Sequence, residues 1–229
     1  SVKVKEMPPK AYAEFHGIDP QTKKEKSPGM LTLLRKAPST FWTVGLVQFF
    51  CWAAFMYMWT YTNGAIADTV WETTDVRSEG YQEAGNWVGI LFAIQAIGSM
   101  LWALLIPKFK SIKTVYVVSL LLGAVGFASV FFIHDQYILF ASFLLIGAAW
   151  AAMLAIPFTL LTNSLSGDHI GTYLGLFNGT ICLPQIVAAA CGGILLRMVG
   201  GSQVSMFLIA GILLVCGAAA VYLVKEKRV

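Results

Sequence analysis

The side chains of this sequence that could bind a polar solute are amides and aromatic rings, placed at helical spacing inside long uncharged stretches. Asn178, Cys182, Gln185 and Ala189 recur at i, i+4, i+7 and i+11, which places them on one face of a helix. An amide in an apolar helix either hydrogen-bonds a solute or joins two helices. Both interpretations stay open, and we take Asn178 and Gln185 as candidate solute contacts.

A second face combines aromatic rings with an amide. Trp52, Met56, Trp59 and Asn63 follow the same helical spacing. Such a face suits a sugar ring, whose C–H surface stacks on an aromatic ring while its hydroxyls take hydrogen bonds. The alternative is a belt of aromatic residues at the membrane surface, to which Trp59 would belong. We take Trp59 and Asn63, with Gln95 of the next apolar stretch, as further candidate contacts.

Prolines and glycines mark the later stretches. Pro157 and Pro184 lie well inside two apolar runs, where each removes a backbone donor and should bend its helix. We interpret them as helix kinks that shape a gate. Gly171, Gly175 and Gly179 repeat every four residues, a spacing that predicts close packing of two helices.

Residues for catalysis or metal binding are not grouped in the sequence. The histidines His16, His134 and His169 lie in different connections, and neither His-Glu-x-x-His nor Cys-x-x-Cys occurs. We therefore expect no enzyme, no metal site and no cofactor. The basic segment before Ala37 is polar and punctuated by Pro and Gly, so we interpret it as a solvated segment rather than a nucleic-acid site.

The elements that carry these residues are long runs without Asp, Glu, Lys or Arg. A helix needs roughly 20 predominantly apolar residues to cross a bilayer. The composition agrees, since 57% of the residues are hydrophobic and 12% are charged. We predict an all-α membrane protein with six transmembrane helices, at about 40–66, 84–106, 114–133, 137–163, 171–196 and 202–224.

The placement of basic residues predicts the orientation of these spans. Of the 16 Lys and Arg residues, only Arg77 and Arg197 fall on one side of a six-span zigzag. Basic residues concentrate on the cytoplasmic side, so both termini are expected in the cytoplasm of a multi-pass protein of the cell (inner or plasma) membrane. Residues 1–39 would then be a cytoplasmic segment, and 40–229 a six-helix transmembrane bundle with a short cytoplasmic tail.

The six spans differ in polarity. The third and sixth contain few polar residues, whereas the first, second, fourth and fifth carry most of the amides and hydroxyls. Polar groups in hydrocarbon are costly and tend to face protein or a water-filled cavity. We expect four spans to border a cavity or lie inside, and two to face lipid.

Several of these segments resemble a known family. The run Gly175-Leu176-Phe177-Asn178 followed by Pro184-Gln185, the approach Trp150-Ala151-Ala152, and Asn86-Trp87-Val88-Gly89 after an acidic loop are similar to the sucrose- and maltose-type branch of glycoside–cation symporters in the major facilitator superfamily. The resemblance covers about Thr40 to Val224.

This resemblance implies one half of a twelve-helix fold, built from two inverted three-helix repeats, with the substrate site between the halves. The expected function is secondary active transport of a di- or oligosaccharide, coupled to a cation and working by alternating access. The expected partners are the lipid bilayer, the sugar, the cation and an N-terminal six-helix half. The alternatives are a six-helix structural or assembly subunit and a channel-like homodimer.

The predicted orientation can be tested with reporter fusions. A green fluorescent protein fused after Val229 should fluoresce, because that end is expected in the cytoplasm. Alkaline phosphatase fused after Asp75 should be active, because the loop between the first two spans is expected outside. If alkaline phosphatase is active after Val229 and inactive after Asp75, the orientation is the reverse of the predicted one.

Overall fold

The computed structural model describes residue 15 and residues 29–165 and 170–224. The chain divides into two compact units, Ser1–Lys36 and Ala37–Val229. In the first unit the described residues include helix α2, Met30–Lys36, which ends on Arg35 and Lys36. The predicted division into a cytoplasmic segment 1–39 and a bundle 40–229 stays a prediction, because this unit boundary says nothing about the membrane.

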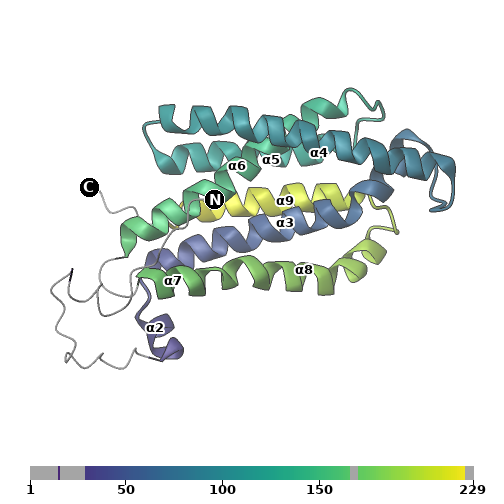
Figure 1. The fold of residues 1–229 in the computed structure, drawn as a ribbon. Helices are drawn as coiled ribbons and strands as arrows, with labels where there is room; N and C mark the ends of the chain where they lie inside the picture. Colours follow the sequence, from purple (N-terminus) through teal and green to yellow (C-terminus); the bar gives the residue numbers. More distant parts are fainter. Residues whose placement is uncertain (1–14, 16–28, 166–169, 225–229) are drawn as a thin grey trace. The chain divides into compact units, whose positions relative to one another are not determined.

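The described residues of the second unit form helices joined by short connections (Figure 1). Serine side chains start two of them: Ser78 accepts a hydrogen bond from the backbone of Tyr81, and Ser111 from that of Thr114. The helices are α3 (Ser39–Val70), α4 (Glu79–Leu105) with the 3-10 turn η1 (Ile106–Lys108), α5 (Ile112–Val130), α6 (Leu139–Ser164), α7 (Ile170–Phe177), α8 (Gly179–Met198) and α9 (Ser205–Val221).

Five helical segments are long and apolar enough to cross a bilayer, with α7 and α8 together counted as one. The chain is therefore a multi-pass membrane protein, whose described residues form helices as their only regular structure. The sixth predicted span corresponds to α9, which has 17 residues. That length lies at the lower limit of roughly 17–25 residues for a transmembrane helix, so the six-helix half fold stays a prediction.

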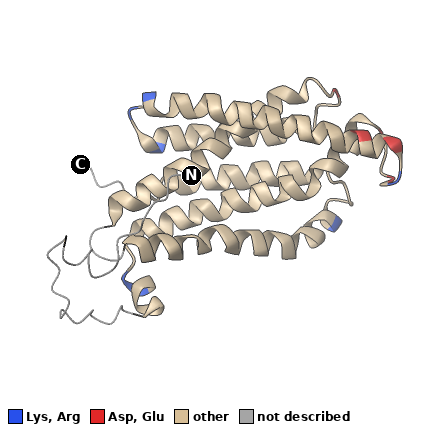
Figure 2. Ribbon diagram, in the orientation of Figure 1, with Lys and Arg blue, Asp and Glu red and all other residues tan. Residues whose placement is uncertain are grey.

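Charged residues lie at the ends of these helices (Figure 2). The basic connection between α4 and α5 and the acidic connection between α3 and α4 lie at opposite ends of the 27-residue α4. Because a charge in hydrocarbon is costly, this separation is expected of helices that cross a membrane. Which end faces the cytoplasm rests on the sequence argument alone.

The fifth predicted span is one helical stretch, Ile170–Met198, with a local irregularity at Asn178. The backbone of Asn178 stays helical, with φ −59° and ψ −22°, and its N–H is shared between the carbonyls of Leu174 at 3.3 Å and Gly175 at 3.2 Å. Glycine is a poor helix former, and Gly175 and Gly179 flank this irregularity. The predicted close packing of these glycines is wrong within the described residues, since a Cβ at Gly171, Gly175 or Gly179 would have no neighbour within 4 Å.

The helices pack in a pattern that repeats. Helix α3 packs against α8 and α9, while α6 packs against α4 and α5. If α3 is exchanged with α6, α4 with α8 and α5 with α9, the α3–α8 contact becomes the α6–α4 contact and the α3–α9 contact becomes the α6–α5 contact. Helices α5 and α9 also contact each other. Such packing is what two related three-helix units would produce, and it supports the predicted pair of inverted repeats without establishing their orientation.

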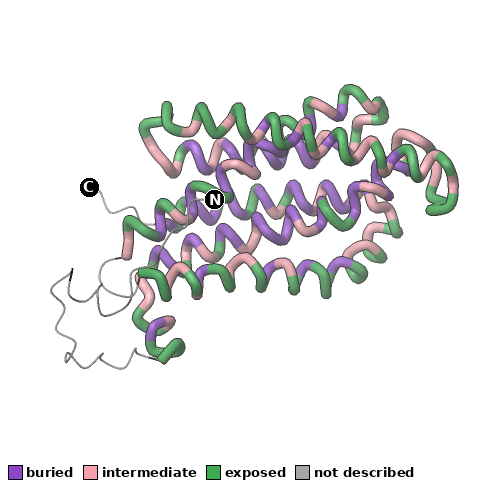
Figure 3. Tube along the Cα trace, viewed as in Figure 1, coloured by how far each residue is buried: buried purple, intermediate pink, exposed green. Residues whose placement is uncertain are grey.

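Burial within the bundle differs among the polar-rich spans. Helix α3 is the most buried, with 67% of its apolar window buried, whereas α4 and α8 are the least buried, with 17% each (Figure 3). The apolar α5 and α9 each bury one face against their neighbours. The uncovered faces of α4 and α8 are compatible with a cavity or with lipid, so the predicted division into four cavity-bordering and two lipid-facing spans stays a prediction.

Two helix contacts depend on glycines, which have no side chain to separate the helices. Where α4 crosses α6, a Cβ at Gly98 would lie 2.5 Å from the carbonyl oxygen of Leu144, and a Cβ at Gly147 would lie 2.7 Å from the backbone nitrogen of Ser99. Both approaches are backbone to backbone. Where α8 meets α3, a Cβ at Gly192 would instead meet the side-chain oxygen of Tyr61 at 2.7 Å.

The α4–α6 contact yields a test of stability. Gly98→Ala should lower the melting temperature of the purified protein, because the added methyl group meets the backbone of Leu144, and overpacking typically costs about 1–3 kcal/mol. Gly89→Ala on the same helix is the matched control, since its Cβ would have no neighbour within 4 Å. Equal melting temperatures for the two variants would argue against the close approach.

Candidate functional site

An aromatic cluster joins α3 to α6. Trp150 of α6 lies at its centre, with ring centroids 5.7 Å from Trp52, 5.0 Å from Phe55 and 5.6 Å from Trp59. The three α3 residues are spaced i, i+3 and i+7, so they share one helical face. Edge-to-face and tilted contacts at these distances are favourable for aromatic rings. The cluster therefore holds the middle of α6 against one face of α3.

The members of this cluster differ in exposure. Phe55 is fully buried, Trp52 is 8% exposed and Trp59 is 41% exposed. Trp59 thus presents ring surface at the edge of the cluster, while Trp52 and Trp150 support it from behind. A ring that is held rigidly and left partly open can stack against the apolar face of a ligand.

Polar atoms lie next to the cluster on the same face of α3. Gln48 is completely buried, and its Oε1 accepts a hydrogen bond of 3.4 Å from the Tyr116 hydroxyl of α5. The Nε2 of Gln48 and the Nε1 of Trp52 are buried donors without a hydrogen-bond partner among the described residues. The interior of the bundle therefore combines aromatic surface with unused N–H groups.

Two of the predicted contacts, Asn63 and Gln95, lie at helix contacts. Asn63 faces the start of α4, where a Cβ at Gly85 would lie 3.4 Å from its Oδ1, and that oxygen is buried without a partner among the described residues. Gln95 is 7% exposed and lies in the α4–α6 contact, where Gly147 approaches its backbone. Their roles as solute contacts stay predictions.

The other predicted contacts lie on the far side of the bundle. Asn178 is exposed directly before α8, and Gln185 is partly buried next to the buried Pro184. Helix α8 packs on α3, whereas α4 packs mainly on α6, so the two helices lie on opposite sides of the bundle (Figure 1). The structure therefore groups Trp59 with Asn63 on α3 but does not bring Gln95 close to Gln185.

The two prolines lie inside their helices. Pro157 lies inside α6, and Pro184 lies inside α8. Both side chains are buried. Their predicted role in shaping a gate stays a prediction.

The sequence analysis missed Trp150 and Gln48 as site residues. Trp150 is the single large side chain between Gly147 and Ala152, and one ring among small residues is a weak signal. Gln48 was grouped with many other polar residues of the spans. What singles out both residues is contact across helices, with Trp52 and Tyr116 respectively, which no spacing within one helix reveals.

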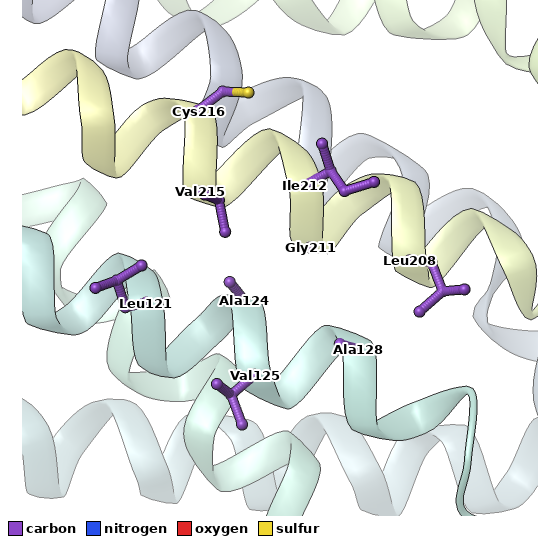
Figure 4. A pocket seen from close by; sticks show the side chains of 9 residues that line it. All are labelled: Leu121, Ala124, Val125, Ala128, Leu208, Gly211, Ile212, Val215 and Cys216. Atoms are coloured by element: carbon purple, nitrogen blue, oxygen red, sulfur yellow. The ribbon is translucent and has the colours of Figure 1, made fainter.

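A groove of about 680 Å³ lies elsewhere, between α5 and α9. Its wall contains only apolar or weakly polar side chains, and those of Ala124 and Val215 point into the gap between the helices (Figure 4). A groove without hydrogen-bonding groups does not suit a polar solute. The lining residues are Leu121, Ala124, Val125, Ala128, Leu208, Gly211, Ile212, Val215 and Cys216.

Metal ligands are not gathered in the described part of the chain. No group of three or more His, Cys, Asp or Glu side chains is placed there to hold a metal ion. Of the four cysteines, Cys51 is buried and the other three are exposed.

Comparisons with known proteins agree with this architecture. Residues 41–229 match the family model described as Major Facilitator Superfamily. A 154-residue stretch is 28% identical to the magnetosome protein MamH of Paramagnetospirillum magneticum (strain ATCC 700264 / AMB-1), covering 66% of this chain and 36% of that protein. The chain thus spans about a third of the length of this relative. No solved structure matches the chain significantly.

The family match covers nearly all of the transmembrane helices and includes every residue of the aromatic cluster. Proteins of this family are membrane transporters and not enzymes. This chain belongs to the Major Facilitator Superfamily.

Proposed function

We propose that this chain is the C-terminal half of a secondary active transporter of the sucrose- and maltose-type branch, which moves a di- or oligosaccharide by alternating access. Family membership supports transport of a solute. The match to only 36% of the MamH sequence supports a chain that works with a further half. The partly open ring of Trp59, held by Trp150, is the observation that carries the choice of a sugar.

The chemistry of the cluster suits a neutral ring. Sugars present an apolar C–H face that stacks on an aromatic ring, and hydroxyls that need hydrogen-bond partners. No Asp, Glu, Lys or Arg occurs between Ala37 and Ala67 or between Gln136 and Gly167, the stretches that contribute the cluster. A charged solute would lack a counter-charge from these helices, and a buried unpaired charge is costly. The cluster therefore favours an uncharged polar solute.

The remaining partners follow from the same proposal. The uncovered faces of α4 and α8 would pack against the N-terminal six-helix half or the lipid bilayer. A coupling cation would bind mainly outside this chain, because no acidic residue lies deep in the apolar runs. The transporter would lie in the inner or plasma membrane with both termini in the cytoplasm.

The resemblance to MamH favours a second candidate. That relative is named a magnetosome protein, so transport across a magnetosome membrane is the alternative to sugar transport at the cell surface. A fluorescent fusion of the complete protein, expressed in its own host, separates the two. Fluorescence along the cell envelope supports the sugar proposal, and fluorescence on intracellular vesicles supports the alternative.

Removing the exposed ring tests the sugar proposal directly. In the complete transporter, Trp59→Ala should raise the KM for uptake of radiolabelled maltose or sucrose about tenfold, equivalent to ~1.4 kcal/mol of lost stacking. Trp42→Ala is the matched control, since Trp42 is also exposed on α3 but lies outside the cluster. If the parent takes up neither sugar, with or without a proton uncoupler, the proposal fails.

The amide of Gln185 provides an independent test. Gln185→Ala should lower sugar uptake about fivefold while the amount of protein in the membrane stays unchanged, because one hydrogen bond contributes about 1 kcal/mol. Gln136→Ala is the control, since Gln136 is also half-buried but lies in the connection before α6. Uptake equal to that of the parent would exclude Gln185 as a solute contact.

A further inference from the structure

Helix α2 leaves two adjacent apolar side chains uncovered. Met30 is 63% exposed and Leu31 is 77% exposed, whereas Leu33, on another face of the same helix, is 4% exposed. Single exposed apolar side chains are common on proteins and need no explanation. Here two large ones lie side by side at the start of a seven-residue helix, directly before a helix that is long and apolar enough to cross a bilayer. Their position points to an apolar environment at the membrane.

Two basic side chains end the same helix. Arg35 and Lys36 belong to its last turn, and both are exposed (Figure 2). Arg35 follows Leu31 by four residues, so the two are neighbours on one face of the helix. No Asp or Glu occurs between Ser27 and Ala67, so no acidic side chain close in the sequence balances the two charges. Helix α2 thus presents apolar surface beside positive charge.

The chain ties α2 to the start of α3. Only Ala37 and Pro38 separate the two helices. Consecutive Cα atoms are about 3.8 Å apart, so the Cα atom of Lys36 lies within about 11 Å of that of Ser39 at any angle between the helices. Wherever α3 enters the bilayer, the basic end of α2 is therefore close to that level.

The start of α3 fits the level of the lipid headgroups. Its 32 residues span about 48 Å at 1.5 Å per residue, slightly more than the roughly 40–45 Å of a bilayer with its headgroups. Trp42, in the first turn of α3, is 56% exposed. Tryptophan is enriched at the membrane–water interface, where its ring lies among the headgroups. Both observations place the residues just before α3 at the surface of the bilayer.

We propose that α2 binds anionic phospholipids, with Met30 and Leu31 inserted at the boundary of headgroups and acyl chains and with Arg35 and Lys36 on the phosphate oxygens. Amphipathic helices bind membranes in the plane of this interface. Anionic lipids attract basic residues next to a transmembrane helix, and the guanidinium group of arginine matches phosphate geometry. The segment before Ala37 was expected from the sequence to be solvated, and the exposed apolar pair is what assigns α2 to the lipid surface.

Removing the two charges tests the lipid preference. In the complete protein, the double variant Arg35→Gln/Lys36→Gln should reduce the affinity for phosphatidylglycerol about 30-fold, the equivalent of ~2 kcal/mol, since each basic residue near an anionic surface contributes about half of this. The affinity is read from the rise of the melting temperature as phosphatidylglycerol is added to the protein in detergent, with phosphatidylcholine as the reference lipid. Lys108→Gln/Lys110→Gln is the matched control, because it removes the same charge from the exposed connection between α4 and α5 and should keep the preference.

A photoreactive side chain identifies what covers the apolar pair. Leu31→p-benzoylphenylalanine in the complete protein should form an adduct with lipid when vesicles containing phosphatidylglycerol are irradiated, as read by mass spectrometry. The same side chain in place of Val76, which is 58% exposed in the connection between α3 and α4, is the control and should form no lipid adduct.

The outcomes decide the proposal independently of sugar transport. A lost preference for phosphatidylglycerol in the α2 variant, together with a lipid adduct at position 31, supports it. An unchanged preference, or an equal loss in the Lys108→Gln/Lys110→Gln control, overturns it. An adduct of position 31 with another polypeptide, or no adduct with lipid, also overturns it, because the apolar pair would then be covered by protein or by water. Uptake of sugar is measured separately and is unaffected by any of these results.

Discussion

The apolar helices of this protein lie in hydrocarbon, which forms no hydrogen bonds, and the rest of the structure depends on this constraint. A polar group inside a bilayer must find its partner within the protein. The threonines of the spans show the commonest solution, in which a hydroxyl donates to the carbonyl four residues earlier on the same helix, as Thr60 does to Met56, Thr62 to Met58 and Thr159 to Ala155. Against this background, the few groups left without a partner are conspicuous, and they gather on one face of α3.

Much of the architecture could be predicted from the sequence, because the constraint acts on runs of residues. The uncharged stretches identify the helices, and the major facilitator resemblance agrees with the family match. The finer features could not be predicted in this way. The irregularity at Asn178 depends on how one backbone N–H is shared between two carbonyls. The glycines that matter, Gly98 and Gly147, are identified by the helix that crosses them and not by a repeat along the chain.

The candidate site was predicted less completely than the fold. Trp59 and Asn63 share a face of α3, as their spacing requires, and Trp59 is partly exposed. The support of that ring comes from Trp150, nearly a hundred residues later in the sequence, and no periodicity links the two. Gln95 is a similar case. Its burial beside the close crossing of α4 and α6 depends on the neighbouring helix and is not indicated by its polarity, and its role as a solute contact stays a prediction.

The contrast between the two glycine contacts has a mechanical consequence. At the crossing of α4 and α6, main chain lies against main chain, and no side chain stands between them that could adopt another rotamer. A shift of α4 along α6 would therefore have to move main chain directly against main chain. At the contact of α8 with α3, the ring and hydroxyl of Tyr61 lie between the backbones. A shift of α8 against α3 could instead be accommodated by another rotamer of Tyr61, a response that the crossing of α4 and α6 does not offer.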